Sequence, residues 1–110
     1  MKIVAAADHG GFEMKNQIVE DLRKQGFAVE DLGTNSADSV DYPDFAEKAT
    51  AKVLAGQADL GILVCGTGIG ISIAANRHKG IRAAILYDDY VAKVAREHNN
   101  ANVLCFGGRT

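Results

Sequence analysis

The strongest structural signal in this chain is Leu60-Gly61-Ile62-Leu63-Val64-Cys65-Gly66-Thr67-Gly68-Ile69-Gly70. Its first part is a short apolar run of the kind that forms a buried parallel strand. The glycines at 66, 68 and 70 then allow a tight turn, after which the chain takes on helical spacing. A buried strand that turns directly into a helix is the building unit of α/β proteins. Repetition of this unit along the chain would indicate an α/β fold.

It does repeat, on both sides of this stretch. Apolar runs predict five strands, at Ile3–Ala7, Phe27–Leu32, Leu60–Val64, Ile81–Leu86 and Asn102–Phe106. Between them, apolar residues at helical spacing with glycine or asparagine stops predict helices at about 12–26, 43–56, 70–80 and 88–99. We expect a single domain over residues 1–110, built as a three-layer α/β/α sandwich around a five-stranded parallel sheet, Rossmann-like in arrangement.

The segments that follow the strands are where a ligand site is expected, because open parallel sheets bind ligands beyond the carboxyl ends of their strands. Here these segments are Asp8–Gly11, Gly33–Tyr42, Cys65–Gly70, Asp88-Asp89 and Gly107–Arg109. They hold most of the chemically interesting side chains.

Composition excludes several classes of function. Twelve basic and 14 acidic residues give a net charge of −2, which argues against nucleic acid as a partner. No apolar run approaches the roughly 20 residues of a membrane helix, and charge appears too early for a secretion signal. The two cysteines lack Cys-x-x-Cys spacing and a histidine cluster, so we expect no metal and no other cofactor. A soluble cytoplasmic protein follows by elimination.

The turn after Cys65 suits a phosphate or a developing oxyanion, because its glycines let several N–H groups point at one spot beside a helix N-terminus. A thiol placed there favours the reactive thiolate. The alternative, of equal weight, is a tight glycine turn beside a small buried cysteine. The loop lacks the ending of a P-loop and the spacing of a dinucleotide fingerprint. Asp88 stands where a dinucleotide fold places its ribose-binding acid, which keeps a nucleotide-binding module open as a rival.

Two further pairs have a functional and a structural interpretation. His9 beside a helix start suits a phosphate, and Asp8 suits sugar hydroxyls, although Asp8 could instead cap that helix. His98 and Asn99 end the last helix, where His98 shares a face with Val91 and Val94 and could equally be a packed core histidine. Tyr42, His78 and Cys105 carry no function from spacing alone.

Taken together, these residues resemble the type B ribose-5-phosphate isomerase family, with its relatives the allose- and galactose-6-phosphate isomerases. The matching signatures are Ala7-Asp8-His9-Gly10-Gly11, Asp41-Tyr42-Pro43, Gly61 to Ser72 with its Cys-Gly-Thr-Gly-x-Gly-x-Ser core, and His98-Asn99-Asn100-Ala101-Asn102-Val103-Leu104. They occur in the family's order and spacing, and the likeness runs from Met1 to Thr110.

The resemblance implies an aldose–ketose isomerase of the pentose phosphate pathway. Cys65 would be the base that moves a proton through an enediolate, and the N–H groups of Gly66, Thr67, Gly68, Ile69 and Gly70 would bind the oxyanion. Thr67 and His98 would help to open the sugar ring. The sugar oxygens would be held by Asp8, Tyr42 and Asn99, and the phosphate end would lie near His9 and Arg109.

Family members usually continue into a C-terminal helix and a basic tail, which this sequence lacks. The tail supplies phosphate-binding arginines and part of the dimer contact, so an inactive structural fragment is a third hypothesis. In a parallel sheet, His98 and Asn99 precede the last strand and lie roughly 17 Å from the end that carries Cys65. We therefore expect a homodimer, or a tetramer, with active sites shared between subunits.

Overall fold

A computed structural model describes residues 1–110 as a five-stranded parallel sheet in the order β2-β1-β3-β5-β4. The strands are β1 (Lys2–Ala7), β2 (Ala28–Asp31), β3 (Leu60–Cys65), β4 (Ala83–Ile85) and β5 (Val103–Gly107). The helices are α1 (Phe12–Lys24), α2 (Tyr42–Leu54), α3 (Ile69–Asn76) and α4 (Asp89–Glu97). None of the four helices combines the length and the apolar character that a bilayer span requires. The predicted three-layer α/β fold is confirmed.

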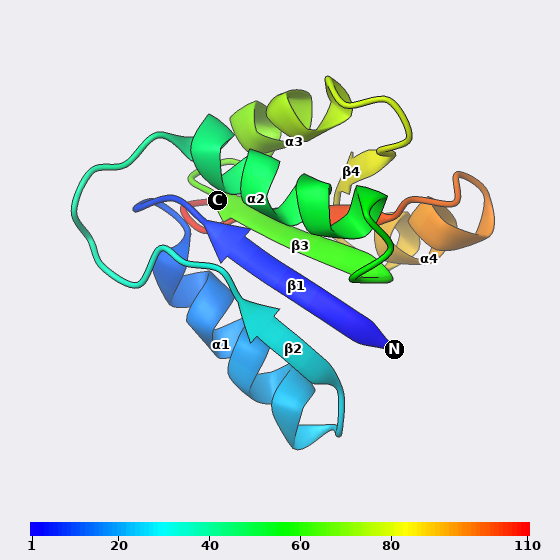
Figure 1. Cartoon of the computed structure of the whole chain (residues 1–110), viewed down its shortest axis with the longest axis horizontal. Helices are drawn as coiled ribbons and strands as arrows, with labels where there is room; N and C mark the ends of the chain where they lie inside the picture. The colour runs from blue at the N-terminus through cyan, green and yellow to red at the C-terminus, as the bar shows by residue number, and fades with distance from the viewer.

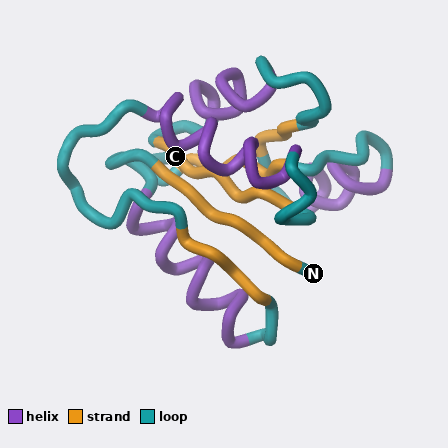
Figure 2. The backbone as a smooth tube through the Cα atoms, in the orientation of Figure 1, coloured by secondary structure: helices purple, strands orange, loops and turns teal.

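The helices cover the two faces of the sheet in pairs. Figure 1 shows α2 and α3 on the near side of the sheet, with α4 behind it. This arrangement follows from right-handed crossovers, because the chain moves along the sheet in one direction through α2 and α3 and in the opposite direction through α1 and α4. The tube view in Figure 2 shows the strand ends and the loops that follow them gathered on one side of the molecule.

The core is built from small aliphatic side chains in two clusters, one on each face of the sheet. The cluster under α2 and α3 includes Ala46, Leu63 and Ile71, and the cluster on the α1 face includes Ala5, Val19 and Val64. Ala5, Ala6 and Ala7 are all fully buried, so helices can approach β1 closely. A chain with no Trp and only 6% aromatic residues packs its interior in this way.

The edge strands are shorter than the apolar runs predicted. β4 covers only Ala83–Ile85 of the predicted Ile81–Leu86. The Asn76 side chain accepts from the N–H of Ala83 at 2.8 Å and donates to its carbonyl at 3.0 Å, which occupies the free edge of β4. Tyr42 also differs from the prediction, since it is the first residue of α2 rather than part of the loop before it. Hydrophobicity predicts burial, but edge pairing depends on such side-chain contacts.

Candidate active site

Three loops meet at the carboxyl ends of the central strands β1, β3 and β5. The N–H of Gly108 donates to the carbonyl of Cys65 at 2.7 Å, and the N–H of Arg109 donates to the carbonyl of Gly66 at 2.9 Å. A Cβ at Gly10 would lie 3.1 Å from the Gly66 nitrogen, and one at Gly108 would lie 2.6 Å from the Gly10 carbonyl oxygen. Glycine is thus required at these contacts, because backbone packs directly on backbone.

Cys65 ends β3 at the centre of this meeting point and is only 5% exposed. Its sulfur accepts a hydrogen bond of 3.1 Å from the N–H of Gly68. Gly68 has a φ of 80° and is the N-cap of α3, so the helix begins at the residue whose N–H faces the thiol. An N–H directed at sulfur, together with a helix N-terminus, stabilises negative charge on the sulfur.

The N–H groups of the loop divide into two sets. Those of Gly68 and Ile69 are occupied, the first by the sulfur of Cys65 and the second by Thr67 Oγ1 at 3.1 Å. Those of Gly66, Thr67 and Gly70 form no hydrogen bond within the chain. The family resemblance implied that all five residues from Gly66 to Gly70 would offer donors. The structure leaves three of these five N–H groups free, two of them directly after Cys65.

Asp8 and His9 follow β1 and face the same region. Asp8 is 7% exposed, and its Oδ1 accepts from the N–H of Gly10 at 2.9 Å. The N-cap of α1 is Gly11, which has no side-chain cap, so the alternative that Asp8 caps this helix is wrong. His9 Nδ1 accepts a hydrogen bond of 3.2 Å from the N–H of Val40 in the loop before α2.

Tyr42 and Arg109 border the loop from either side. A Cβ at Gly70 would lie 2.9 Å from the Cζ of Tyr42, so the tyrosine ring lies directly against α3's first turn. A Cβ at Gly66 would lie 3.5 Å from the Cδ of Arg109. The structure therefore brings together the predicted residues from Asp8, His9 and Tyr42 through Cys65–Gly70 to Arg109.

His98 and Asn99 are not part of this assembly. Residue 98 caps the C-terminus of α4, and both side chains are exposed, so the packed-core interpretation of His98 is wrong. The register of β3 and β5 pairs Gly61 with Val103 and Cys65 with Gly107, which places the turn after α4 at the opposite end of the sheet from the thiol. Figure 1 shows this turn far from the arrowheads of β1 and β3. Within one subunit, His98 and Cys65 cannot contact one small sugar.

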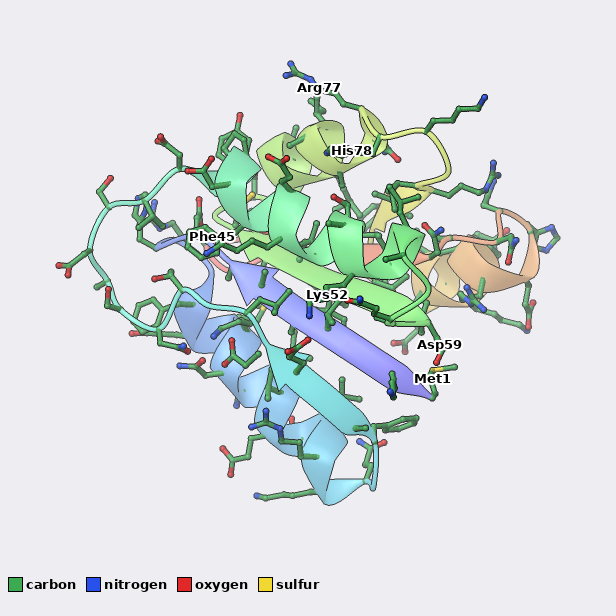
Figure 3. All side chains as sticks on the ribbon, in the orientation of Figure 1. Met1, Phe45, Lys52, Asp59, Arg77 and His78 are labelled. Atoms are coloured by element: carbon green, nitrogen blue, oxygen red, sulfur yellow. The ribbon has the colours of Figure 1, made fainter.

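Two residues noted in the sequence have structural roles. Asp88 Oδ1 accepts from the N–H of Val91 at 2.8 Å and so caps α4. This is the acidic residue on which the nucleotide-binding alternative rested, and the structure gives it the role of a helix cap. Cys105 is buried in the core, where burial and, to a smaller degree, the charge of Cys65 raise its pKa to about 12. His78 lies beside Arg77 at the end of α3 away from these loops (Figure 3). Nowhere in the structure do three or more His, Cys, Asp or Glu side chains lie together in a group that could hold a metal ion.

Lys15 was missed by sequence reasoning. It is fully buried in α1, and its Nζ lies 2.7 and 2.8 Å from the carboxylate oxygens of Asp31 and 2.6 Å from Asn35 Oδ1. A lysine in an amphipathic helix is usually taken as part of its solvated face. The available signal was its spacing of four residues from the buried Val19, which places both on one face.

A parallel α/β sheet with a thiol and converging glycine loops at its strand ends defines the class of α/β proteins that bind small ligands beyond the carboxyl ends of their strands. The family model of Ribose/Galactose Isomerase matches residues 3–110. This chain belongs to that family.

Individual relatives and solved structures support the same family assignment. The chain is 48% identical to ribose-5-phosphate isomerase B of Escherichia coli over 108 residues, which covers 98% of this chain and 72% of that protein. It is 47% identical to the putative sugar phosphate isomerase YwlF of Bacillus subtilis, and the match covers 99% of this chain and 74% of that protein. Its structure is similar to that of ribose-5-phosphate isomerase B from Clostridium thermocellum, with a TM-score of 0.98, 51% identity, and coverage of 99% and 74%. The structure of ribose 5-phosphate isomerase from Thermotoga maritima is similar with a TM-score of 0.96 and 53% sequence identity, and the match covers 98% of this chain and 74% of that chain.

Proposed function

We propose that this chain is an aldose–ketose isomerase that interconverts D-ribose 5-phosphate and D-ribulose 5-phosphate, a step of the pentose phosphate pathway. Residues 1–110 would form one sugar-phosphate isomerase domain. The observation that carries the proposal is the Cys65 thiol at the end of β3, with the Gly68 N–H directed at its sulfur and the Gly66 and Thr67 N–H groups free beside it. Family membership and the named activities of the relatives support it.

The chemistry requires one base and one oxyanion site. The Cys65 thiolate removes the proton from C2 of the open-chain aldose, and the electron pair of that C–H bond forms the C1–C2 double bond. The carbonyl oxygen on C1 becomes an oxyanion, which N–H groups of Gly66 and Thr67 can stabilise. A proton then passes from the hydroxyl on C2 to the oxyanion on C1, and Cys65 returns its proton to C1 while the electron pair of the C1–C2 double bond forms the new C1–H bond and the oxygen on C2 becomes the ketone. No metal or other cofactor is needed for these steps.

The surrounding residues bind and orient the substrate in this proposal. Asp8, Tyr42 and Asn99 hold sugar oxygens, while His9 and Arg109 contact the phosphate. Thr67 and His98 assist ring opening. The exposed positions of His98 and Asn99, at the far end of the sheet, support a homodimer in which each subunit lends this pair to its partner's site. α3 offers an apolar surface for such contact, since Ile69 and Ile73 are both more than half exposed.

The family description also names galactose, so a hexose 6-phosphate is the second candidate substrate. The candidates share one reaction and differ in the length of the carbon chain between the reacting carbons and the phosphate, and, for galactose, also in the configuration of its hydroxyl groups. Two free thiols, Cys65 and Cys105, fit a reducing compartment such as the cytoplasm.

A coupled assay of isomerisation tests the proposal. Purified protein is given ribose 5-phosphate, allose 6-phosphate or galactose 6-phosphate, and ketose formation is followed with the Cys65→Ser variant as control. We expect turnover of ribose 5-phosphate by wild type alone. Absence of turnover with every substrate, combined with thermal stabilisation by an adenine or nicotinamide nucleotide, would instead support the nucleotide-binding module.

A further inference from the structure

The buried ion pair of Lys15 and Asp31 calls for an explanation beyond stability. Lys15 is fully buried, and its three contacts of 2.6 to 2.8 Å satisfy all the hydrogens of its ammonium group. Removing an ammonium and a carboxylate from water is costly, and an apolar side chain of the same size usually stabilises a fold as well. Such a pair is better suited to fixing one arrangement of the segments that it joins.

The segments it joins are the start of α1 and the loop that leaves β2. Lys15 lies in the first turn of α1, where its N–H donates to the carbonyl of Gly11 at 2.9 Å, directly after the loop of Asp8 and His9. Asp31 ends β2, and its Oδ1 also accepts from the N–H of Gly33 at 2.9 Å. Asn35 lies further along, so a single ammonium group holds both the end of β2 and one point of the loop over residues 32–41.

This loop forms one wall of the candidate site. It is tied to β1 where the N–H of Thr34 donates to the carbonyl of Ala7 at 2.8 Å, and it reaches the site where the N–H of Val40 donates to His9 Nδ1. Residues 35–39 between these ties are exposed, and their one hydrogen bond to each other joins Asp38 to Ser36. The loop swings wide of the sheet (Figure 1). The bond from Lys15 to Asn35 is therefore the anchor at the start of this exposed stretch.

The contact at Val40 fixes the chemical form of His9. A backbone N–H can only donate, so Nδ1 must carry a lone pair, and the ring proton lies on Nε2. His9 then offers a single N–H donor at Nε2, which suits a phosphate oxygen. Displacement of Val40 would free Nδ1 and let the ring exchange its tautomers.

We propose that Lys15 is a positioning residue of the active site. Through Asp31 and Asn35 it holds residues 33–41 in place, so that Val40 keeps His9 in the Nε2–H form that donates to the substrate phosphate. This proposal rests on the proposed function for its substrate, and on contacts within the chain for its mechanism.

The test compares two variants with two matched controls. Asn35→Ala removes the loop's anchor at an exposed position, and Lys15→Met removes the ammonium group at similar length. Ser39→Ala is the control for the loop, since its exposed side chain makes no hydrogen bond. Lys24→Met is the control for the helix, because Lys24 forms an exposed ion pair of 3.0 Å with Glu20 in α1. Each protein is measured for kcat and KM with ribose 5-phosphate, for the ¹⁵N chemical shifts of the His9 ring, and for amide exchange at Val40.

We expect Asn35→Ala and Lys15→Met to lower kcat/KM by about tenfold or more, chiefly by raising KM, because phosphate binding is shared by ground and transition states. The Nδ1 and Nε2 shifts of His9 should move toward each other, and the Val40 amide should exchange faster. Both controls should match wild type in all three measurements. The His9 signals are assigned with a His9→Asn variant.

A purely structural role would have another signature. If Asn35→Ala lowered the midpoint of thermal unfolding but left kcat/KM within twofold and the His9 shifts unmoved, the proposal would be overturned. Should Lys15→Met fail to fold, Asn35→Ala decides the question alone. If wild type did not isomerise ribose 5-phosphate, the proposed function would fail, while the His9 shifts and Val40 exchange would still decide the role of Lys15.

Discussion

The backbone N–H of Gly68 points at the sulfur of Cys65 across 3.1 Å. Because Gly68 has a φ of 80°, the contact depends on a conformation that residues with a Cβ rarely adopt. The same glycine begins α3, so one turn both starts the helix and places its positive end at the thiol. Local geometry at residue 68 thus determines the hydrogen bond that the sulfur of residue 65 receives.

Cys65→Ala should abolish isomerisation while the fold persists. The other thiol, Cys105, is fully buried in the core and cannot replace Cys65 as the base. Cys65 is 5% exposed and packs in the core, so the loss of the sulfur should cost about 1 to 2 kcal/mol. Activity is measured per mole of folded protein, with circular dichroism as the control for folding. Retention of most of the wild-type kcat would remove Cys65 from the mechanism.

Gly11→Ala should destabilise the protein strongly. A Cβ at this position would run into the carbonyl group of Val64 in β3, which is backbone and cannot move aside. We expect a loss of about 3 kcal/mol or more in the free energy of unfolding, measured by urea denaturation. Gly61→Ala is the matched control, because its Cβ would meet side-chain methyl groups of Val103 and Val53 at 3.4 and 3.5 Å, an ordinary contact. Equal losses for the two variants would contradict this account.

The fold could be predicted from sequence because its signals are local. Apolar runs and glycine stops located all nine elements, and strand order in a right-handed α/β sheet then places Asp8 and Cys65 at one edge. What escaped prediction depends on contacts between distant residues. The burial of Lys15 depends on Asp31 and Asn35, and the exposure of His98 depends on how α4 lies on the sheet. Which N–H groups of the glycine loop stay free also depends on such contacts. The sulfur of Cys65 accepts from Gly68 and Thr67 Oγ1 accepts from Ile69, whereas the N–H groups of Gly66 and Thr67 have no partner.

Stability should fall in alkaline solution because of Cys105. Burial, with a smaller effect of Cys65, raises the pKa of Cys105 from an unfolded value of 9.0 to about 12 in the folded protein. Between these two values the unfolded chain releases a proton that the folded chain retains, so the free energy of unfolding decreases as pH rises from 9 toward 12. The full effect is on the order of 4 kcal/mol, from about 1.4 kcal/mol per pKa unit. Urea denaturation at several pH values should show a shallower slope for Cys105→Ala, and an unchanged slope would contradict the assignment.

Chelation should leave turnover unchanged. No group of three or more His, Cys, Asp or Glu side chains has the geometry of a metal site, and backbone N–H groups can stabilise the enediolate instead. The initial rate with ribose 5-phosphate is measured before and after exhaustive dialysis against a chelator, with a known metalloenzyme treated in parallel. Loss of activity that divalent ions then restored would show this description of the oxyanion site to be wrong.

Mixing two inactive variants tests whether the sites are shared. The strand register places His98 at the opposite end of the sheet from Cys65, so both can act on one sugar only if they come from different subunits. Cys65→Ala and His98→Ala should each be inactive or nearly so, and the second should fold normally because His98 is exposed.

In a mixed dimer, one site combines the intact Cys65 of one subunit with the intact His98 of the other, while the second site lacks both. Random exchange makes half of the dimers mixed, so activity should return to about a quarter of the wild-type value. Mixing Cys65→Ala with Cys65→Ser is the control and should recover nothing, since neither subunit supplies the thiol. If mass spectrometry confirms that subunits have exchanged and activity stays at zero, the shared site is ruled out.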